Sequence, residues 1–457
     1  MLFRSGGWVE HDPEDIWQSQ LATAREAIRL ADVGAADIAC IGIANQRETV
    51  VLWERKTGRP VARAIVWQCR RTAEVCATLR EQGHEPLVRE KTGLLLDPYF
   101  SATKIAWLLD HIPGLRGRAE VGDICFGTID SWLIHRLTGA HLTDPSNASR
   151  TLLFNLHTGT WDDELLGLFR VPCAVLPEIR STSGIFAPTK PEWFGGAIPV
   201  SGVVGDQQAA LFGQACFAAG EAKNTYGTGA FVLVNTGKEA IVSTNRLLTT
   251  VAWDTGDGLC YALEGAVFVA GAVVQWLRDG MGLVANAAET DAICRTVDDT
   301  GGVVFVPAFV GLGAPHWDPQ VRGSLLGLTR GTGRPHVIRA ALESIAYQCH
   351  DLLQAIEKDT GTRMPSLKVD GGASANDFLM QFQADILGIP VVRSAIPETT
   401  ALGAAYLAGL AVGVWGSTAE IRSLWSERDR FRPTMTSPAR TALLDQWHRA
   451  LAAARQF

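Results

Sequence analysis

The sequence lacks the short motifs by which several large enzyme classes are recognised. Its 457 residues contain no GxxxxGK[ST], GxGxxG, HExxH or GxSxG pattern. These patterns are the primary signals of P-loop, dinucleotide-binding, zinc-protease and serine-hydrolase sites. Any phosphate-binding site in this chain must therefore be built in another way.

Paired cysteines, long apolar runs and basic stripes are also missing. The nine cysteines form no CxxC pair, which predicts buried free thiols in a reducing cytoplasm. The longest apolar stretch, residues 401–415, is too short to span a bilayer and predicts a packed core helix. The first residues show no apolar leader, so we expect no secretory signal. A net charge of −7 without a basic stripe argues against a nucleic-acid partner. We predict a cytoplasmic protein without membrane insertion.

The order of helical and strand patterns indicates an α/β protein. A chain of this length exceeds what one core usually holds, which favours two domains. Asp12 followed by Pro13 and two acids predicts a helix start, and short apolar runs then alternate with helical segments. The sequence pattern changes near residues 210–216, and the later half alternates helix and strand, starting with an expected helix over 266–279. This alternation is typical of a domain with a mixed sheet. We place the domains at 1–213 and 214–457.

Two polar segments follow apolar strands. Arg47 and Glu48 come after the run IACIGIAN, and neighbours on a strand face opposite ways, so at least one is expected to point inward. A surface ion pair is the alternative. Asp206 and Gln207 follow another strand and precede a helix, where a carboxylate is either a catalytic base or a helix cap.

Glycine turns and aromatic residues each allow two interpretations, one as ligand-binding groups and one as ordinary structural elements. Gly227 and Thr228 lie between two strand patterns, where backbone N–H groups can hold phosphate oxygens or form a plain hairpin. Gly372 and Asn376 end another strand, at a position that ligands favour in α/β sheets. Gly271 and Gln275 share a helix face, which suits a flat ring or helix packing. Trp67 and Tyr99 either wall a ligand or belong to the core.

Together these passages resemble the FGGY family of carbohydrate kinases, and among its members those that act on glycerol. The specific passages include GWVEHDPEDIW, GIANQRETVVLWE, AIVWQCRRTAE, GDQQAALFGQ, KNTYGTGAF and VDGGASANDFLMQFQADILG. The segments YFSATKIAWLLDH and GSLLGLTRGTGRPHVIRAALE look like the two signatures of the family. The resemblance runs from Gly7 to about Pro433.

The resemblance implies a two-domain, actin- and hexokinase-like (ribonuclease H-like) ATPase fold with a central cleft. It implies ATP-dependent phosphorylation of glycerol with Mg²⁺, in a homo-oligomer, and no resident metal ligand in the chain. Asp206 would be the catalytic base. The substrate-binding residues would be Arg47, Glu48, Trp67, Tyr99, Asp206, Gln207 and Phe231, and the nucleotide-binding residues Gly227, Thr228, Gly271, Gln275, Gly372 and Asn376.

The sequence departs from the family pattern in two places. No DQGTT-like phosphate loop occurs among its residues, so we expect the first domain to lack the hairpin that carries it. The segment PEWFGGAIPV has no arginine, so we expect no inhibition by fructose 1,6-bisphosphate. Two alternatives follow: an FGGY kinase for another polyol or sugar, and a catalytically impaired chain that only binds ligand.

Overall fold

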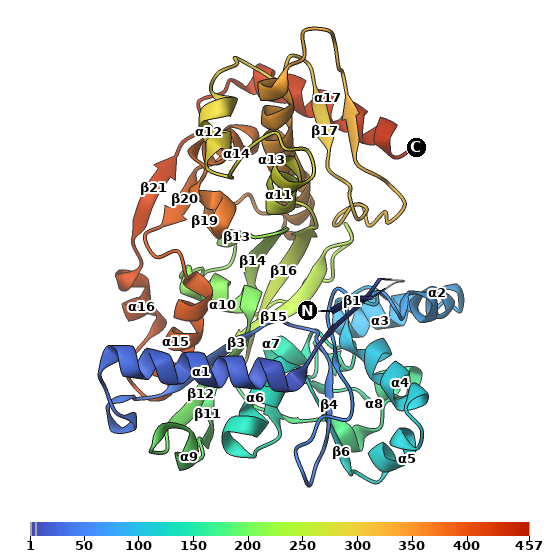
Figure 1. Ribbon diagram of the computed structural model, residues 1–457, viewed down its shortest axis with the longest axis vertical. Helices are drawn as coiled ribbons and strands as arrows, with labels where there is room; N and C mark the ends of the chain where they lie inside the picture. Colours follow the sequence, from blue (N-terminus) through green and yellow to red (C-terminus); the bar gives the residue numbers. More distant parts are fainter. Residues whose placement is uncertain (1, 5–6, 457) are drawn as a thin grey trace.

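The computed structural model describes residues 2–4 and 7–456, which form two regions around central strands (Figure 1). The helices of the first half are α1 (Pro13–Ala31), α2 (Ala73–Glu81), α3 (Glu85–Thr92), α4 (Ser101–His111), α5 (Leu115–Glu120), α6 (Ile129–Thr138), α7 (Pro145–Ala148), α8 (Asp163–Phe169), α9 (Pro191–Phe194) and α10 (Asp206–Gly213). Its strands are β1 (Leu2–Arg4), β2 (Trp8–His11), β3 (Ile41–Asn45), β4 (Val51–Glu54), β5 (Ala64–Ile65), β6 (Ile124–Gly127), β7 (Leu142–Thr143), β8 (Phe154–Asn155), β9 (Thr160–Trp161), β10 (Glu178–Ile179), β11 (Ser183–Pro188) and β12 (Pro199–Gly205).

The second half is built around one large sheet. Its strands are β13 (Ala222–Tyr226), β14 (Ala230–Gly237), β15 (Leu248–Asp254), β16 (Leu259–Val267), β17 (Val304–Val306), β18 (Ser324–Leu326), β19 (Leu367–Asp370), β20 (Val391–Ser394) and β21 (Glu427–Phe431). Its helices are α11 (Gly271–Asp279), α12 (Glu289–Cys294), α13 (Arg334–Thr360), α14 (Asp377–Leu387), α15 (Thr399–Ala411), α16 (Thr418–Leu424) and α17 (Ser437–Ala454).

The two halves differ in how their strands pair. The second half has a seven-stranded sheet in the order β15-β16-β14-β13-β19-β20-β21, in which β13, β19 and β20 run parallel and the other pairs antiparallel. This is the expected mixed sheet. The described strands of the first half form smaller groups, among them β11-β12-β3, β1-β2-β5 and β4-β6. In the first of these groups β12 runs parallel to β3, so their carboxyl ends meet at one edge.

Local signals in the sequence account for the first helix. The Asp12 side chain accepts a hydrogen bond from the Glu14 N–H at 3.0 Å, and Pro13 occupies the first turn. Both features satisfy or remove donors that a helix start leaves unpaired. The helix ends at Asp32, which has a left-handed backbone.

Helix α15, from the second half, packs against elements of the first. It lies beside α10, β12 and β3, and one hydrophobic cluster includes Val204 and Phe212 together with Leu407. The approach is so close that a Cβ on Gly42 would lie 2.3 Å from the Ala404 carbonyl oxygen. The prediction of a packed core helix here is confirmed.

Two other expectations about local structure are corrected. The expected helix over 266–279 begins only at Gly271, because residues up to Val267 belong to β16, where pairing with β14 determines the structure. All nine cysteines are free, but Cys173 is exposed and Cys40 half-buried, so the expectation of buried thiols is wrong for these two. In the part of the chain that the structure describes, no helix combines the length and apolar character needed to cross a membrane.

Candidate active site

Arg47 and Glu48 lie in the turn between β3 and β4. The pairing of Asn45 with Gly205 places this turn beside the start of α10, because β3 and β12 end at the same edge. Both side chains are 2% exposed, so the alternative of a surface ion pair is wrong. Strand alternation does not explain their burial, since neither lies on a strand and Glu48 has a φ of 59°. The turn itself directs both side chains inward.

The Arg47 guanidinium contacts groups from both halves of the chain. It forms a two-point ion pair with Glu264 of β16, in which Nη2 donates to Oε1 at 3.0 Å and Nη1 donates to Oε2. Its Nε lies 3.2 Å from Asp206 Oδ1. Nη1 also donates to Gln208 Oε1 at 3.1 Å, and Nη2 to the Tyr99 hydroxyl at 3.4 Å. Arg47 is therefore fixed before any ligand is bound.

A second arginine completes what we call the buried charge network, namely Arg47, Glu48, Arg150 and Glu264. Arg150 Nε donates to Glu48 Oε1 at 2.6 Å, and Nη2 donates to Glu264 Oε1 at 2.9 Å. Burial raises the pKa of the Glu48 carboxyl. Burial also acts to raise the pKa of Glu264, but the two arginines outweigh it and lower that pKa to about 2. The network balances two cations with two carboxylates away from water.

Sequence reasoning missed Arg150 and Glu264. Glu264 lies in the otherwise apolar run CYALEGAVFV, and a carboxylate in a buried strand must be paired. That signal was available. The partners were not identifiable, because Arg47 is 217 positions away in the sequence.

Asp206 is the first residue of α10, with its side chain 36% exposed. Its Oδ1 faces Arg47 and also accepts the Gln207 N–H at 2.8 Å. Asp206 is thus a carboxylate held between a buried cation and the surface.

The neighbouring Gln207 is held by a buried lysine. Lys223 Nζ lies 2.5 Å from Gln207 Oε1 and 3.3 Å from the Phe231 carbonyl oxygen. Burial lowers the pKa of Lys223 to about 8. The structure therefore connects two predicted substrate residues, Gln207 and Phe231, through a residue that the sequence did not single out.

The two other predicted aromatic residues pack against each other. Trp67 and Tyr99 are half-buried, and their ring centroids lie 5.6 Å apart in an edge-to-face arrangement. Through its hydroxyl Tyr99 joins Arg47. No contact of the Phe231 ring with either ring is recorded among the described residues.

The glycine turn 227–229 joins β13 to β14 and contacts the start of α11. The Gly271 N–H donates to the Gly227 carbonyl at 3.0 Å, and the Ala272 N–H to the Thr228 carbonyl at 3.0 Å. A Cβ on Gly271 would lie 2.5 Å from the Gly227 oxygen. Gly227 and Thr228 are exposed. Gln275, one helical turn after Gly271, is exposed as well.

The other predicted nucleotide segment lies beside the same turn. Parallel pairing sets Thr225 opposite Asp370, so β13 and β19 end together. A Cβ on Gly371 would lie 2.4 Å from the Tyr226 carbonyl oxygen. Gly372 is exposed, and Asn376 caps α14 by accepting the Leu379 N–H at 2.8 Å. The predicted nucleotide residues thus meet at the carboxyl ends of adjacent strands, where ligands bind in open α/β sheets.

The arrangement offers fixed charged groups beside one half-exposed carboxylate, and exposed glycine backbone at neighbouring strand ends. A separate cavity of about 740 Å³ lies elsewhere, lined by residues such as His157, Arg180 and Tyr261. It contains none of the predicted site residues.

Comparison with known families assigns both halves. Residues 1–213 match the N-terminal domain, and residues 222–412 the C-terminal domain, of the FGGY family of carbohydrate kinases. The chain belongs to this family. The resemblance proposed from the motifs is therefore confirmed, together with the mixed α/β, actin- and hexokinase-like fold of the family.

Curated relatives of this FGGY family member extend over nearly its whole length. It is 58% identical to glycerol kinase of Janthinobacterium sp. (strain Marseille), covering 100% of this chain and 92% of that protein. It is 56% identical to glycerol kinase of Deinococcus radiodurans, covering 100% and 91% respectively.

Solved structures show the same architecture. Plasmodium falciparum glycerol kinase with ADP superposes with a TM-score of 0.92 at 38% identity, covering 99% of this chain and 91% of that one. A xylulose kinase from Lactobacillus acidophilus superposes with a TM-score of 0.88 at 23% identity, covering 100% and 91%. At that identity the second likeness concerns the fold alone.

Proposed function

We propose that this chain transfers the γ-phosphoryl group of ATP to glycerol, forming sn-glycerol 3-phosphate. The observation that carries the proposal is the 3.2 Å contact between Asp206 and the buried Arg47. It places a half-exposed carboxylate beside a guanidinium whose other contacts are already fixed. The named relatives support glycerol as the substrate.

The charged groups suit a small molecule that carries several hydroxyls. Arg47 would supply a donor by exchanging its long 3.4 Å contact with the Tyr99 hydroxyl, Glu48 would supply acceptors, and the Trp67 and Tyr99 rings would supply an apolar wall. A site that pairs hydroxyls rejects analogues that leave its polar groups unpaired. Gln207 and Phe231 would complete this substrate side.

Phosphoryl transfer requires positioning and charge stabilisation more than covalent chemistry. Asp206 would accept the proton of the attacking hydroxyl. Gly227, Thr228, Gly271, Gln275, Gly372 and Asn376 would hold ATP, with backbone N–H groups of the glycine turn facing its phosphates.

Mg²⁺ fits this set of groups as an ion carried by the nucleotide. Protein sites usually hold Mg²⁺ through one or two carboxylates and the substrate phosphates. Asp206 is the half-exposed carboxylate available for this, and the described residues form no cluster of three ligating side chains here. When bound, the ion would neutralise charge on the phosphates.

Turnover measurements test the proposal. ADP release is followed with Mg²⁺ and glycerol, erythritol or xylulose, and we expect kcat/KM to be largest for glycerol. Asp206→Asn should lower kcat by about 10² to 10⁴-fold, the usual contribution of a positioned base, with an unchanged urea midpoint because the side chain is partly exposed. Equal turnover of the three substrates, or full activity of Asp206→Asn, contradicts the proposal.

The alternative of a chain that binds without turnover rests on the missing DQGTT-like segment. Calorimetric titration with glycerol and with ADP distinguishes the two, since binding without any ADP release favours the alternative. A substrate-binding domain over 1–213, a nucleotide-binding domain over 214–457, a homo-oligomer and a cytoplasmic location stay predictions. Light scattering after size exclusion tests the oligomer.

A further inference from the structure

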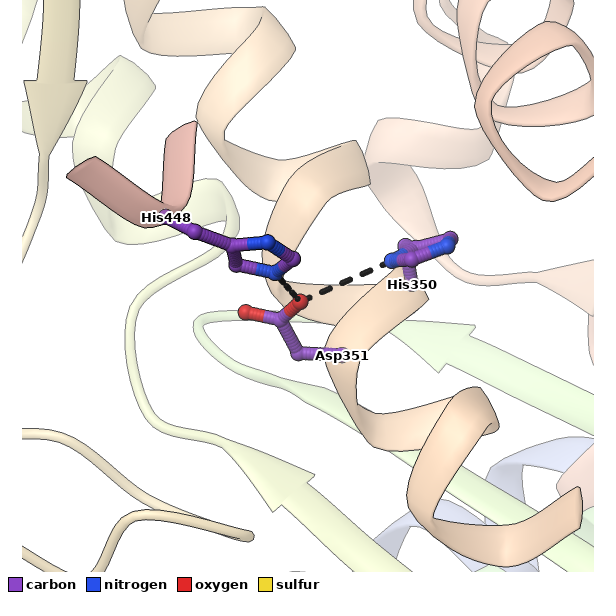
Figure 2. Close-up of side chains that lie close together, drawn as sticks. All are labelled: His350, Asp351 and His448. Atoms are coloured by element: carbon purple, nitrogen blue, oxygen red, sulfur yellow. Dashed lines mark hydrogen bonds and ion pairs between the residues drawn. The ribbon is translucent and has the colours of Figure 1, made fainter. Parts of the chain in front are cut away.

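A cluster of histidine and aspartate side chains lies where α13 meets the C-terminal helix α17. His350 and Asp351 come from α13, and His448 comes from α17 (Figure 2). One potential ligand atom from each residue lies within 4.8 Å of the others. None of the three belongs to the candidate active site, so the proposed kinase function leaves the cluster unexplained.

Two of the three ligand-atom separations are close to those around a transition-metal ion. Tetrahedral zinc with bond lengths near 2.1 Å separates its ligand atoms by about 3.4 Å. The distance from His350 Nδ1 to Asp351 Oδ1 is 3.5 Å. The distance from His448 Nε2 to the same oxygen is 2.8 Å, and the His448 side chain is 50% exposed. That ring is free to move outward by the small amount required, and its exposure gives an ion a path to the site.

A buried imidazole nitrogen faces the carboxylate without forming a hydrogen bond of normal length. The His350 side chain is 7% exposed, and its Nδ1 has no hydrogen-bond partner among the described residues. Figure 2 shows this nitrogen directed toward the Asp351 carboxylate. Buried polar groups are nearly always paired, and an ion between this nitrogen and the carboxylate oxygen would satisfy both better than their 3.5 Å contact does.

The groups around Asp351 resemble the support that metal-ligating carboxylates receive. The Trp447 indole Nε1 donates to Asp351 Oδ2 at 2.7 Å, which leaves Oδ1 facing the two imidazoles. His316 Nε2 lies 3.7 Å from Oδ2. A partner that fixes one carboxylate oxygen and leaves the other facing the imidazoles is the kind of support that metal-ligating carboxylates receive.

We propose that His350, Asp351 and His448 bind one divalent transition-metal ion, with water completing its coordination. Two imidazoles and one carboxylate suit Zn²⁺, Co²⁺ or Ni²⁺ rather than Ca²⁺ or Mg²⁺. The ion would connect α17 to α13. The ordinary alternative is an ion-pair network in which Asp351 holds His448 without any metal.

Zinc titration of the full chain separates these two possibilities. The protein is freed of metal with a chelator and titrated with ZnCl₂ in a calorimeter. The exposed Cys173 is first replaced by serine, so that its thiol does not compete. We expect one site per chain with a dissociation constant below about 10 μM. Zn²⁺ at about ten times that concentration should raise the unfolding temperature.

Variants identify the ligands. His448→Gln changes an exposed position and should weaken Zn²⁺ binding by more than about 100-fold, since even outer-shell changes cost 10- to 100-fold. His157→Gln is the matched control, because this exposed histidine lies outside the cluster, and it should leave the affinity unchanged. Co²⁺ absorption should show nitrogen and oxygen ligands without a thiolate band.

Three results overturn the proposal. They are the absence of a one-to-one site at 100 μM Zn²⁺, equal affinity of the His448→Gln variant and its parent, and a thiolate band in the Co²⁺ spectrum that disappears with a cysteine substitution. Each readout is independent of kinase activity, so loss of turnover does not affect the outcome.

Discussion

The substrate side and the nucleotide side of the candidate site are built by opposite means. On the substrate side, the buried charge network places four ionised groups out of water and pairs each of them. On the nucleotide side, Gly227 and Gly372 expose their backbone, and the missing side chains of the half-buried Gly271 and Gly371 let backbone segments touch. The first side depends on charge balance and the second on empty space, so the two should respond differently to substitution.

Removing one charge from the network should have the largest effect. Glu264→Gln leaves Arg47 and Arg150 without their shared carboxylate, and breaking a buried ion pair costs about 3 to 5 kcal/mol. Urea unfolding followed by tryptophan fluorescence measures this loss. We also expect the affinity for glycerol to fall, because Arg47 loses its two-point contact.

A double variant provides the control for this prediction. Arg150→Met with Glu264→Met removes one cation and one anion, so its cost should be smaller than the sum of the two single costs. Additive costs, or a loss below about 1 kcal/mol for Glu264→Gln, would show that the network is not coupled.

Filling the empty space on the nucleotide side should have an intermediate effect. In Gly271→Ala the new Cβ would lie 2.5 Å from the Gly227 oxygen, and overpacking of this kind costs about 1 to 3 kcal/mol. We expect KM for ATP to rise at least about tenfold while the calorimetric affinity for glycerol stays within twofold.

Gly167→Ala is the matched control for the glycine prediction. Gly167 also lies in a helix, α8, but a Cβ there has nothing within 4 Å. Alanine should stabilise that helix by roughly 0.5 to 1 kcal/mol and leave both substrates unaffected. An equal rise in KM for ATP in the two variants would contradict the steric explanation.

The smallest expected effect concerns Lys223. This residue lies in β13, the strand that leads to the glycine turn, and its side chain contacts Gln207. Burial lowers its pKa to about 8, against about 10.4 in an unfolded chain. Between these values the unfolded chain binds more protons than the folded one. The free energy of unfolding therefore rises with pH in this window, by at most about 1.4 kcal/mol per pH unit.

Lys223→Met should remove the part of this rise that Lys223 contributes. Lys104 is also fully buried, with a pKa lowered to about 8, so Lys223→Met should retain the share contributed by Lys104. Urea midpoints at pH 7.5 and 9.5 measure the slope. An unchanged slope in Lys223→Met would show that this lysine keeps its proton throughout.

Sequence reasoning succeeded where the signal was local. The cap at Asp12, the mixed sheet and the core helix expected in 401–415, observed as α15, follow from residue types within one element. Family motifs brought Arg47, Asp206 and Gly227 into the candidate site. The roles of all the predicted site residues stay predictions until the variants are measured.

What escaped the sequence depends on distant pairing. Glu264 joins residues more than 100 positions away, and no local pattern specifies such a partner. The helix expected from residue 266 begins only at Gly271, because pairing with β14 outweighed the local pattern up to Val267. The proposed metal site departs from the prediction of no metal ligands, since His350 and His448 lie 98 positions apart and only the packing of α17 brings them together.

The contact of α15 with β3, β12 and α10 has a consequence for synthesis of the protein. The surface that α15 covers is complete by Gly213, but residues 214–398 must be made before α15 itself emerges. At ordinary translation rates this takes roughly 10 to 40 s. During that interval the nascent first half exposes the apolar side chains of α10 and β12, which makes it a candidate client for chaperones at the ribosome.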